Sequence, residues 1–213
     1  MDLSNVTVNA QSSVKINGSK VLYFDPFDVQ DVMGDADIIF VTHDHFDHFD
    51  PSSIAKVKND ETIFVAPESM HKKALSEAGI VADKCIFLQP GTENEIKGLK
   101  IKTIPAYNKL KPFHMKSSKW QGYIVTLDGT RYYVAGDTDA NEDVKSVECD
   151  VAILPIGGHY TMDKKQAADL VKVIRPSAVI PTHYGKIVGD PNDGKLFKSL
   201  VEADCDIQVE IKL

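Results

Sequence analysis

A short apolar run followed at once by a dense cluster of histidine and aspartate constrains this chain more than any other segment. Residues 36–41 are β-branched and aromatic and follow a Gly34-Asp35 turn, so they predict a buried strand. From His43 the sequence then reads H-x-H-x-D-H. Imidazole and carboxylate groups are ligands for zinc, manganese and iron, and so many polar groups do not pack well in a core. The segment therefore predicts a metal site on the loop that leaves a buried strand.

The sequence after this loop predicts the start of a helix. Asp50 is a plausible N-cap, and Pro51 suits the first helical position. A strand end and a helix start would thus hold the ligand loop from both sides, which is the rigid support that a metal site needs.

Two other predicted strands end in ligand-type residues. Asp137 follows a strand over residues 130–135, and Gly136 between them allows a close backbone approach. His183 follows a strand over residues 177–181. Taken singly, Asp137 is equally a turn aspartate, and His183 is more typical of a packing or surface histidine. Three strand ends that each carry such residues favour one shared metal site.

The remaining pattern predicts a single domain over residues 1–213 of the α+β class, with two sheets flanked by helices. The predicted strands are residues 6–8, 14–16, 21–24, 36–42, 62–66, 85–88, 99–105, 122–127, 130–135, 150–154, 177–181 and 206–211. The predicted helices are residues 51–58, 67–78, 139–147 (with Asp139 as N-cap), 163–174 and 195–203.

Composition narrows the class of partner. The chain has 213 residues and a formal net charge of −7 without a basic tract, which argues against a nucleic-acid surface. No apolar run approaches the roughly 20 residues of a membrane span. Residues 1–5 lack the basic and apolar regions of a signal peptide, so we expect a cytoplasmic protein. Homo-oligomer formation stays open.

The three motifs together resemble those of the metallo-β-lactamase superfamily of hydrolases. They are T-H-D-H-F-D-H at 42–48, G-D-T at 136–138 and P-T-H-Y at 181–184, in the family's order. The resemblance implies a four-layer αββα sandwich. With P-I-G-G-H-Y-T-M at 155–162, the chain is most similar to a branch of small stand-alone metal-dependent hydrolases that resembles ascorbate-6-phosphate lactonases and phospholipase-D-type phosphodiesterases.

This resemblance implies two divalent metal ions, zinc before manganese or iron. It makes His43 and His45 ligands of the first ion, Asp47, His48 and His183 ligands of the second, and Asp137 the bridge between them. The family's third histidine for the first ion falls on Asn108 in this chain. Either the Asn108 amide oxygen replaces it, or His114 does, or the first site is weak. We favour His114 because imidazole binds transition metals better than a neutral amide.

The implied reaction is hydrolysis of a phosphodiester or of a lactone or ester bond in a small molecule by a hydroxide shared between the metals. Asp47 would also receive a proton, and His159 would contact the substrate or donate a proton. Tyr184 and Lys186 are candidates to bind the leaving oxygen or a phosphate, and Asn108 is a further candidate for substrate binding. Asp25 is a candidate to orient a ligand imidazole, or a simple turn cap.

Three other readings compete with this one. Redox proteins of the same fold carry a carboxylate at the position of His45, so the histidine favours hydrolysis. RNA-processing members have a large inserted domain, for which this chain is too short. A non-catalytic or single-metal binding protein stays open because of Asn108, although Asp137 and His183 exceed what a structural zinc requires.

Overall fold

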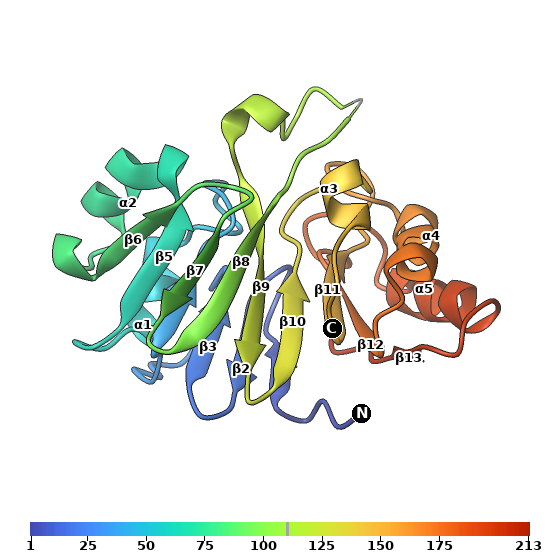
Figure 1. Cartoon of the computed structure of the whole chain (residues 1–213), viewed down its shortest axis with the longest axis horizontal. Helices are drawn as coiled ribbons and strands as arrows, with labels where there is room; N and C mark the ends of the chain where they lie inside the picture. The colour runs from blue at the N-terminus through green and yellow to red at the C-terminus, as the bar shows by residue number, and fades with distance from the viewer. Residues whose placement is uncertain (110) are drawn as a thin grey trace.

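The computed structural model describes residues 1–109 and 111–213 and contains two β-sheets that lie face to face (Figure 1). The first sheet has the order β1-β2-β3-β4-β5-β6 and the second the order β13-β12-β11-β10-β9-β8-β7. The strands of the first sheet are β1 (Val6–Val8), β2 (Val14–Asn17), β3 (Val21–Phe24), β4 (Ile38–Phe40), β5 (Ile63–Pro67) and β6 (Cys85–Leu88). Those of the second are β7 (Glu93–Ile96), β8 (Leu99–Pro105), β9 (Gln121–Leu127), β10 (Thr130–Val134), β11 (Val151–Pro155), β12 (Ala178–Thr182) and β13 (Gln208–Val209).

Helices cover the outer faces of both sheets. On the first sheet lie α1 (Pro51–Val57) and α2 (His71–Glu77), and on the second α3 (Glu142–Lys145), α4 (Lys164–Ile174) and α5 (Asp193–Glu202). Short 3-10 turns form η1 (Glu68–Met70), η2 (Ala82–Lys84) and η3 (Lys116–Ser118). The predicted αββα sandwich is therefore confirmed. In the part of the chain that the structure describes, every helix is too short or too polar to cross a membrane.

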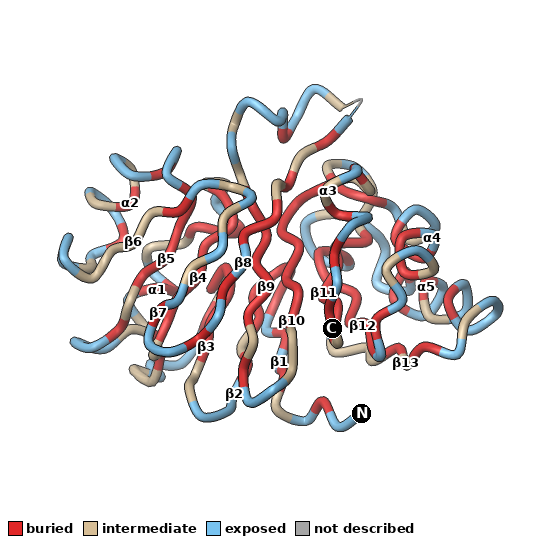
Figure 2. The backbone as a smooth tube through the Cα atoms, in the orientation of Figure 1, coloured by how far each residue is buried: buried red, intermediate tan, exposed pale blue. Residues whose placement is uncertain are grey.

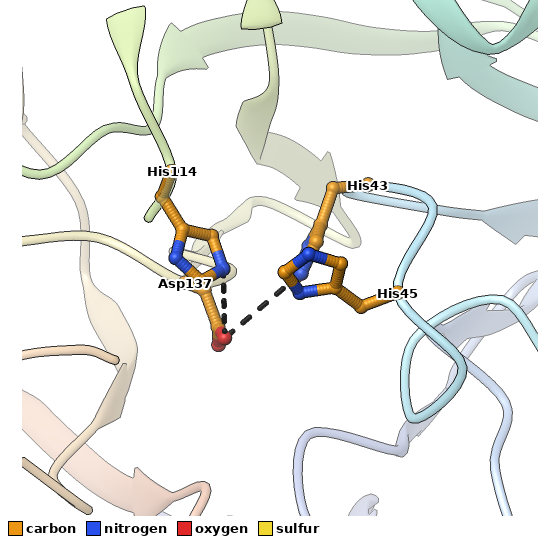
Figure 3. Close-up of side chains that lie close together, drawn as sticks. All are labelled: His43, His45, His114 and Asp137. Atoms are coloured by element: carbon orange, nitrogen blue, oxygen red, sulfur yellow. Dashed lines mark ion pairs between the residues drawn. The ribbon is translucent and has the colours of Figure 1, made fainter. Parts of the chain in front are cut away.

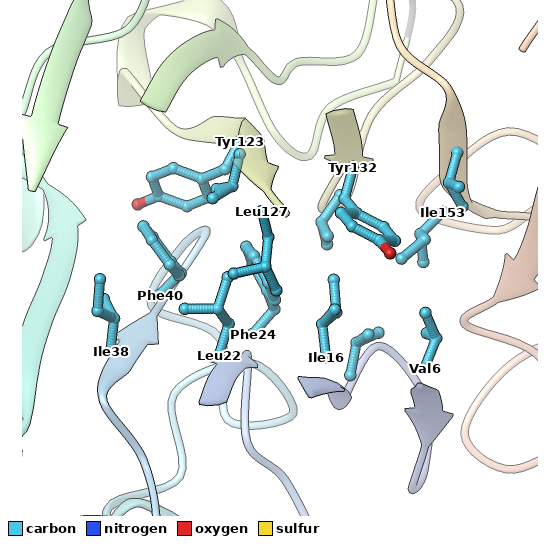
Figure 4. Packing of buried hydrophobic residues seen from close by; sticks show 14 of the residues in the cluster. Val6, Ile16, Leu22, Phe24, Ile38, Phe40, Tyr123, Leu127, Tyr132 and Ile153 are labelled. Carbon is cyan, nitrogen blue, oxygen red and sulfur yellow. The ribbon is translucent and has the colours of Figure 1, made fainter. Parts of the chain in front are cut away.

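The main core lies between the two sheets, and the buried residues are concentrated in the middle of the molecule (Figure 2). Phe24 and Phe40 stack with ring centroids 4.8 Å apart, and Tyr123 of the facing sheet lies 5.1 Å from Phe40 (Figure 4). Burying large apolar side chains of this kind stabilises the fold by about 1.5–3 kcal/mol each. Because both outer faces are also covered, strands such as β11 and β12 are buried along their whole length.

One edge of the sandwich collects the ends of the strands that carry ligand-type residues. β10, β11 and β12 are parallel, and β8 runs in the same direction because both β8 and β10 are antiparallel to β9. The end of β4 reaches this edge from the other sheet. There the Tyr123 hydroxyl donates to the Val41 carbonyl oxygen at 2.7 Å, and the Gln121 N–H donates to the Thr42 carbonyl oxygen at 3.3 Å.

Most predicted elements are present with small shifts in their bounds, and four differ. The N-cap of α3 is Asn141 rather than Asp139, because the Asp139 carboxylate instead accepts from the Lys109 N–H and from Lys111. The predicted helix over residues 67–78 begins as the 3-10 turn η1. β7 was not predicted, because its polar sequence pairs only with β8 at the sheet edge. β13 has only two residues, since its pairing with β12 stops at Val209.

Candidate metal centre

The loop after β4 holds its ligand-type side chains in a tight turn. The N–H groups of His48 and Phe49 both donate to the His45 carbonyl oxygen, at 3.0 and 2.8 Å. Asp50 caps α1 as predicted, because its carboxylate accepts from the Ser52 N–H at 2.9 Å. Backbone hydrogen bonds at one end of the loop and the Asp50 cap at the other therefore fix its course.

His43, His45 and His114 form what we call the first group (Figure 3). One ligand atom from each of them and one from Asp137 all lie within 4.8 Å of one another. Asp137 Oδ2 is 3.3 Å from His114 Nε2 and 3.9 Å from His43 Nε2. Three imidazoles and a carboxylate oxygen thus face a common point.

Asp47, His48 and His183 form the second group, whose ligand atoms also lie within 4.8 Å of one another. His183 Nε2 lies 3.3 Å and His48 Nε2 3.8 Å from Asp47 Oδ2. The other oxygen of Asp137, Oδ1, is 3.3 Å from the Nε2 atoms of both histidines. Asp137 therefore stands between the two groups with one carboxylate oxygen toward each.

Most ligand atoms of the two groups are buried and lack protein partners. The Nε2 atoms of His43, His48, His114 and His183, and Oδ1 of Asp137, have no hydrogen-bond partner among the described residues. Leaving a buried polar atom unpaired costs about 1–3 kcal/mol, so a concentration of such atoms at one point calls for a further group. Nitrogen and oxygen donors of this kind fit a divalent transition-metal ion.

Asp25 lies behind His48 and orients it. The Asp25 carboxylate is fully buried, and its Oδ2 is 2.7 Å from His48 Nδ1. It also accepts from the N–H and the hydroxyl of Thr42, both at 2.7 Å. A carboxylate on Nδ1 holds the proton there and leaves Nε2 free to coordinate, which is the usual support for a metal-binding histidine.

Three residues of this region have left-handed backbone conformations that favour glycine. φ is 44° for Asp25 and 57° for both His114 and His183. Such conformations cost of order 1–3 kcal/mol and concentrate at functional sites. At Gly136, φ is 65° and a Cβ would stand 2.8 Å from the Thr42 Cβ, so glycine is required there for Asp137 to reach the two groups.

Burial and neighbouring charges set the protonation of the groups in the metal-free protein. Burial lowers the pKa of His43 and His45, and neighbouring imidazoles add to this effect. Burial also opposes charge on His48, but the carboxylates of Asp137 and Asp25 outweigh it and raise the pKa well above its usual value. The pKa of Asp137 is held well below its usual range, because His183 and His48 outweigh its burial. In the metal-free protein His43 and His45 are thus driven toward the neutral imidazole, and His48 toward the protonated form.

Asn108 and His114 lie in the same loop after β8. The Asn108 N–H donates to the His114 carbonyl oxygen at 2.8 Å, and its Nδ2 donates to the Tyr160 carbonyl oxygen at 2.7 Å. Its Oδ1 is buried without a partner among the described residues. These bonds hold the turn that brings His114 into the first group.

A cavity of about 340 Å³ opens above the two groups. His45, Asp47, Asp137 and His183 form its floor. Its apolar wall consists of Phe46, Phe113, Tyr160, Ile187 and Val188. A site of this size suits a small molecule.

Sequence reasoning missed the aromatic residues of the site. Trp120, the only tryptophan of the chain, lies 4.8 Å from the His43 ring, 5.0 Å from His45 and 5.2 Å from His114. Phe46 is 67% exposed although it stands in the middle of a polar motif. A phenylalanine between the polar residues His45 and Asp47 has no evident place in a core. This position was the sequence signal that could have indicated the apolar wall of the cavity.

Four residues predicted to act on the substrate lie outside the described lining of this cavity, namely Asn108, whose contacts are given above, His159, Tyr184 and Lys186. His159 is exposed, with its ring 4.4 Å from that of Tyr160, and it is Tyr160 that reaches the wall. Tyr184 is buried against α5, where its hydroxyl would meet a Cβ on Gly194. Lys186 pairs with Asp28 on the surface. Their roles toward substrate stay predictions.

Comparisons with known proteins identify the family of the chain. The sequence profile of the beta-lactamase superfamily domain matches residues 5–183. The chain is 32% identical over 212 residues to the UPF0173 metal-dependent hydrolase of Thermococcus onnurineus (strain NA1), covering 92% of this chain and 91% of that protein. A similar relative from Pyrococcus abyssi is 33% identical over 207 residues, with 87% of each chain covered.

Solved structures share the fold. Igni18, a novel metallo hydrolase from Ignicoccus hospitalis KIN4/I, has a TM-score of 0.78 at 25% identity, covering 97% of this chain and 93% of that chain. CmlA, a diiron β-hydroxylase from Streptomyces venezuelae, has a TM-score of 0.73 at 11% identity, covering 98% of this chain and 52% of that chain. The second likeness concerns the fold alone.

Proposed function

Because the chain belongs to the metallo-β-lactamase superfamily and is a metal-dependent hydrolase of it, we propose that it is a dinuclear enzyme that cleaves a phosphodiester or a lactone or ester bond. The position of Asp137 supports this proposal most directly. Its Oδ2 faces the first group at 3.3 Å from His114, and its Oδ1 faces the second at 3.3 Å from His48 and His183. One carboxylate between two sets of imidazoles suits a pair of ions better than a single one.

We assign one ion to His43, His45 and His114 and the other to Asp47, His48 and His183, with Asp137 shared. The unpartnered Nε2 atoms of His43, His48, His114 and His183 fit this assignment. Imidazole-rich sites with carboxylates suit zinc, with manganese or iron as alternatives.

Two bound divalent ions supply Lewis acidity and a water of lowered pKa. The chain contributes orientation and proton handling. Although burial opposes it, the imidazole of His183, with Nε2 3.3 Å from Oδ2, and the charge of His48 lower the pKa of Asp47, so its carboxylate stays ionised and can accept a proton. Asp25 keeps His48 Nε2 directed at the centre through the 2.7 Å contact with Nδ1.

Metal content per chain tests the assignment. We expect two ions in the wild type, one in His114→Ala and two in Asn108→Ala, measured by plasma mass spectrometry after loading with zinc and, separately, manganese and iron. The Asn108→Ala variant is the matched control because it alters the same loop without removing an imidazole. One ion in the wild type would favour the single-metal binding protein instead, and loss of an ion only in Asn108→Ala would make the amide the third ligand.

A further inference from the structure

Several large apolar side chains around the cavity above the metal centre are exposed, although burying them would stabilise the fold. Phe46, Phe113 and Ile187 are 67%, 46% and 41% exposed, yet they gather at one opening. Large apolar side chains that cluster on the surface mark a place where something apolar binds. Tyr160 and Val188 complete the wall.

Aromatic contacts hold this wall in shape. Phe113 meets Tyr160 edge to face, with centroids 5.1 Å apart and an interplanar angle of 82°. Phe46 meets Phe27 in the same way at 6.1 Å and 74°. Because edge-to-face pairs have a preferred geometry, these contacts hold the three aromatic side chains of the wall in place.

Cationic side chains are missing from the described lining of the cavity. The nearby lysines are engaged elsewhere: Lys186 pairs with Asp28, Lys111 with Asp139, and Lys73 with Asp44. Recognition of an anionic group away from the metal ions would require such a cation or a comparable set of donors. The carboxylate of Asp47 on the floor and the formal net charge of −7 further disfavour an anion.

Wall and metal ligands are neighbours in the sequence. Phe46 lies between His45 and Asp47, Phe113 precedes His114, and Ile187 follows His183 by one short turn. A substrate whose hydrocarbon group packs on the wall therefore has its neighbouring ester bond next to the first and second groups of ligand-type residues. Holding a reacting bond in this way supplies orientation, which is a large part of catalysis.

We propose that the cavity binds an uncharged ester or lactone that bears an alkyl or aryl group, and that Phe46, Phe113, Tyr160, Ile187 and Val188 hold this hydrocarbon group. This inference rests on the proposed hydrolysis. Of the two substrate classes named there, it favours the lactone or ester over the phosphodiester. Binding energy then grows with the buried length of the alkyl group.

A homologous series tests this inference on the metal-loaded protein. The 3-alkylcyclopentanones are uncharged analogues of γ-lactones that cannot be hydrolysed, so calorimetry measures their binding apart from turnover. We expect the affinity to rise about three- to fourfold for each methylene from methyl to hexyl. The specificity constant kcat/KM for γ-lactones from γ-valerolactone to γ-decanolactone should rise in parallel.

Two variants matched in side-chain volume provide the control. Ile187→Ala should weaken hexyl-ketone binding about tenfold and methyl-ketone binding little. Leu196→Ala removes an aliphatic side chain of similar exposure on α5, outside the lining, and should change neither. Metal content measured on both variants separates a damaged centre from a damaged wall.

The outcomes separate this inference from the proposed function. Affinity that does not change with chain length, or faster turnover of bis(4-nitrophenyl) phosphate than of γ-decanolactone, would overturn the apolar ester or lactone assignment even if the protein is a hydrolase. Chain-length-dependent ketone binding without hydrolysis of any lactone or phosphodiester would overturn the proposed hydrolysis while the ligand class stands.

Discussion

Replacing Asp25 by asparagine should reverse the tautomer of His48 and so weaken one metal site alone. In the wild type, Asp25 Oδ2 is 2.7 Å from His48 Nδ1, and the same carboxylate accepts both hydrogen bonds from Thr42. An asparagine of the same shape has only one acceptor oxygen. If that oxygen stays on the Thr42 N–H, the amide NH₂ faces His48 Nδ1 and forces the proton onto Nε2, the atom needed for the metal.

The alternative orientation of the amide is no better. The amide oxygen could accept the hydrogen bond from His48 Nδ1. The amide NH₂ would then face the Thr42 N–H, which is also a donor, and a buried donor would stay unpaired. Either arrangement costs about 1–3 kcal/mol. Losing such a supporting carboxylate typically lowers metal affinity about 10–100-fold. We therefore expect the second group to lose affinity by that factor while the first group keeps its own.

Competition titration with a chromophoric zinc chelator resolves the two equivalents and gives each dissociation constant. Thermal unfolding of the metal-free protein should show a Tm lower by about 2–10 °C, from the same 1–3 kcal/mol. Asp35→Asn is the matched control, because Asp35 also accepts two side-chain hydrogen bonds, from Tyr23 and Lys15, away from the centre. An unchanged second dissociation constant in a folded Asp25→Asn protein would refute the tautomer argument.

Three shorter predictions concern the same centre. Zinc titration should change the fluorescence of Trp120, 4.8 Å from the His43 ring, with the first equivalent, and emission that stays constant through saturation would contradict its placement. Because flanking carboxylates raise the pKa of His48 despite its burial, and metal binds only the neutral imidazole, the affinity of the second group should fall as the pH is lowered from 8 to 6. Titrations at pH 6, 7 and 8 check this, and the first group, whose His43 has a lowered pKa, should vary less. Gly136→Ala should lower the free energy of unfolding by about 2–4 kcal/mol, because alanine is strained at this positive φ and its Cβ would stand 2.8 Å from the Thr42 Cβ. Denaturant unfolding measures this loss, and a value below about 1 kcal/mol would contradict the argument.

Much of the fold could be predicted because its strands are buried on both faces. Two examples are the continuous apolar runs that end at Phe40 and that begin at Val151. The sequence alone identifies such runs as buried strands and gives their order along the chain. The elements that were missed or misplaced lie at edges. β7 pairs on one side only, and the α3 N-cap was decided by Asp139 turning to Lys109 and Lys111 rather than by local propensity.

The site was predictable where ligand residues follow buried strands and less so where they lie on longer loops. His43, Asp137 and His183 each sit within three residues of a strand end. The parallel direction of β10, β11 and β12 brings Asp137 and His183 together, and the end of β4 brings His43 to the same edge from the other sheet. His114 lies nine residues beyond β8, and its approach to Asp137 depends on a left-handed φ of 57° and on the bond from Asn108 to its carbonyl oxygen. Sequence spacing carries no such information, so residue chemistry alone had to choose between Asn108 and His114.

The neighbouring placement of ligand and wall residues also has a consequence for specificity. Phe46 can change its side chain while His45 and Asp47 keep theirs, because the turn closed on the His45 carbonyl oxygen is held by backbone N–H groups of His48 and Phe49. The same holds for Phe113, since the bond that fixes the loop joins the Asn108 N–H to the backbone of His114. Backbone bonds thus hold the proposed ligands in place, and we expect the side chains between them to set which hydrocarbon group fits. We therefore expect substitutions at Phe46 and Phe113, each one position from a proposed ligand, to change the preferred substrate without a change at the ligands themselves.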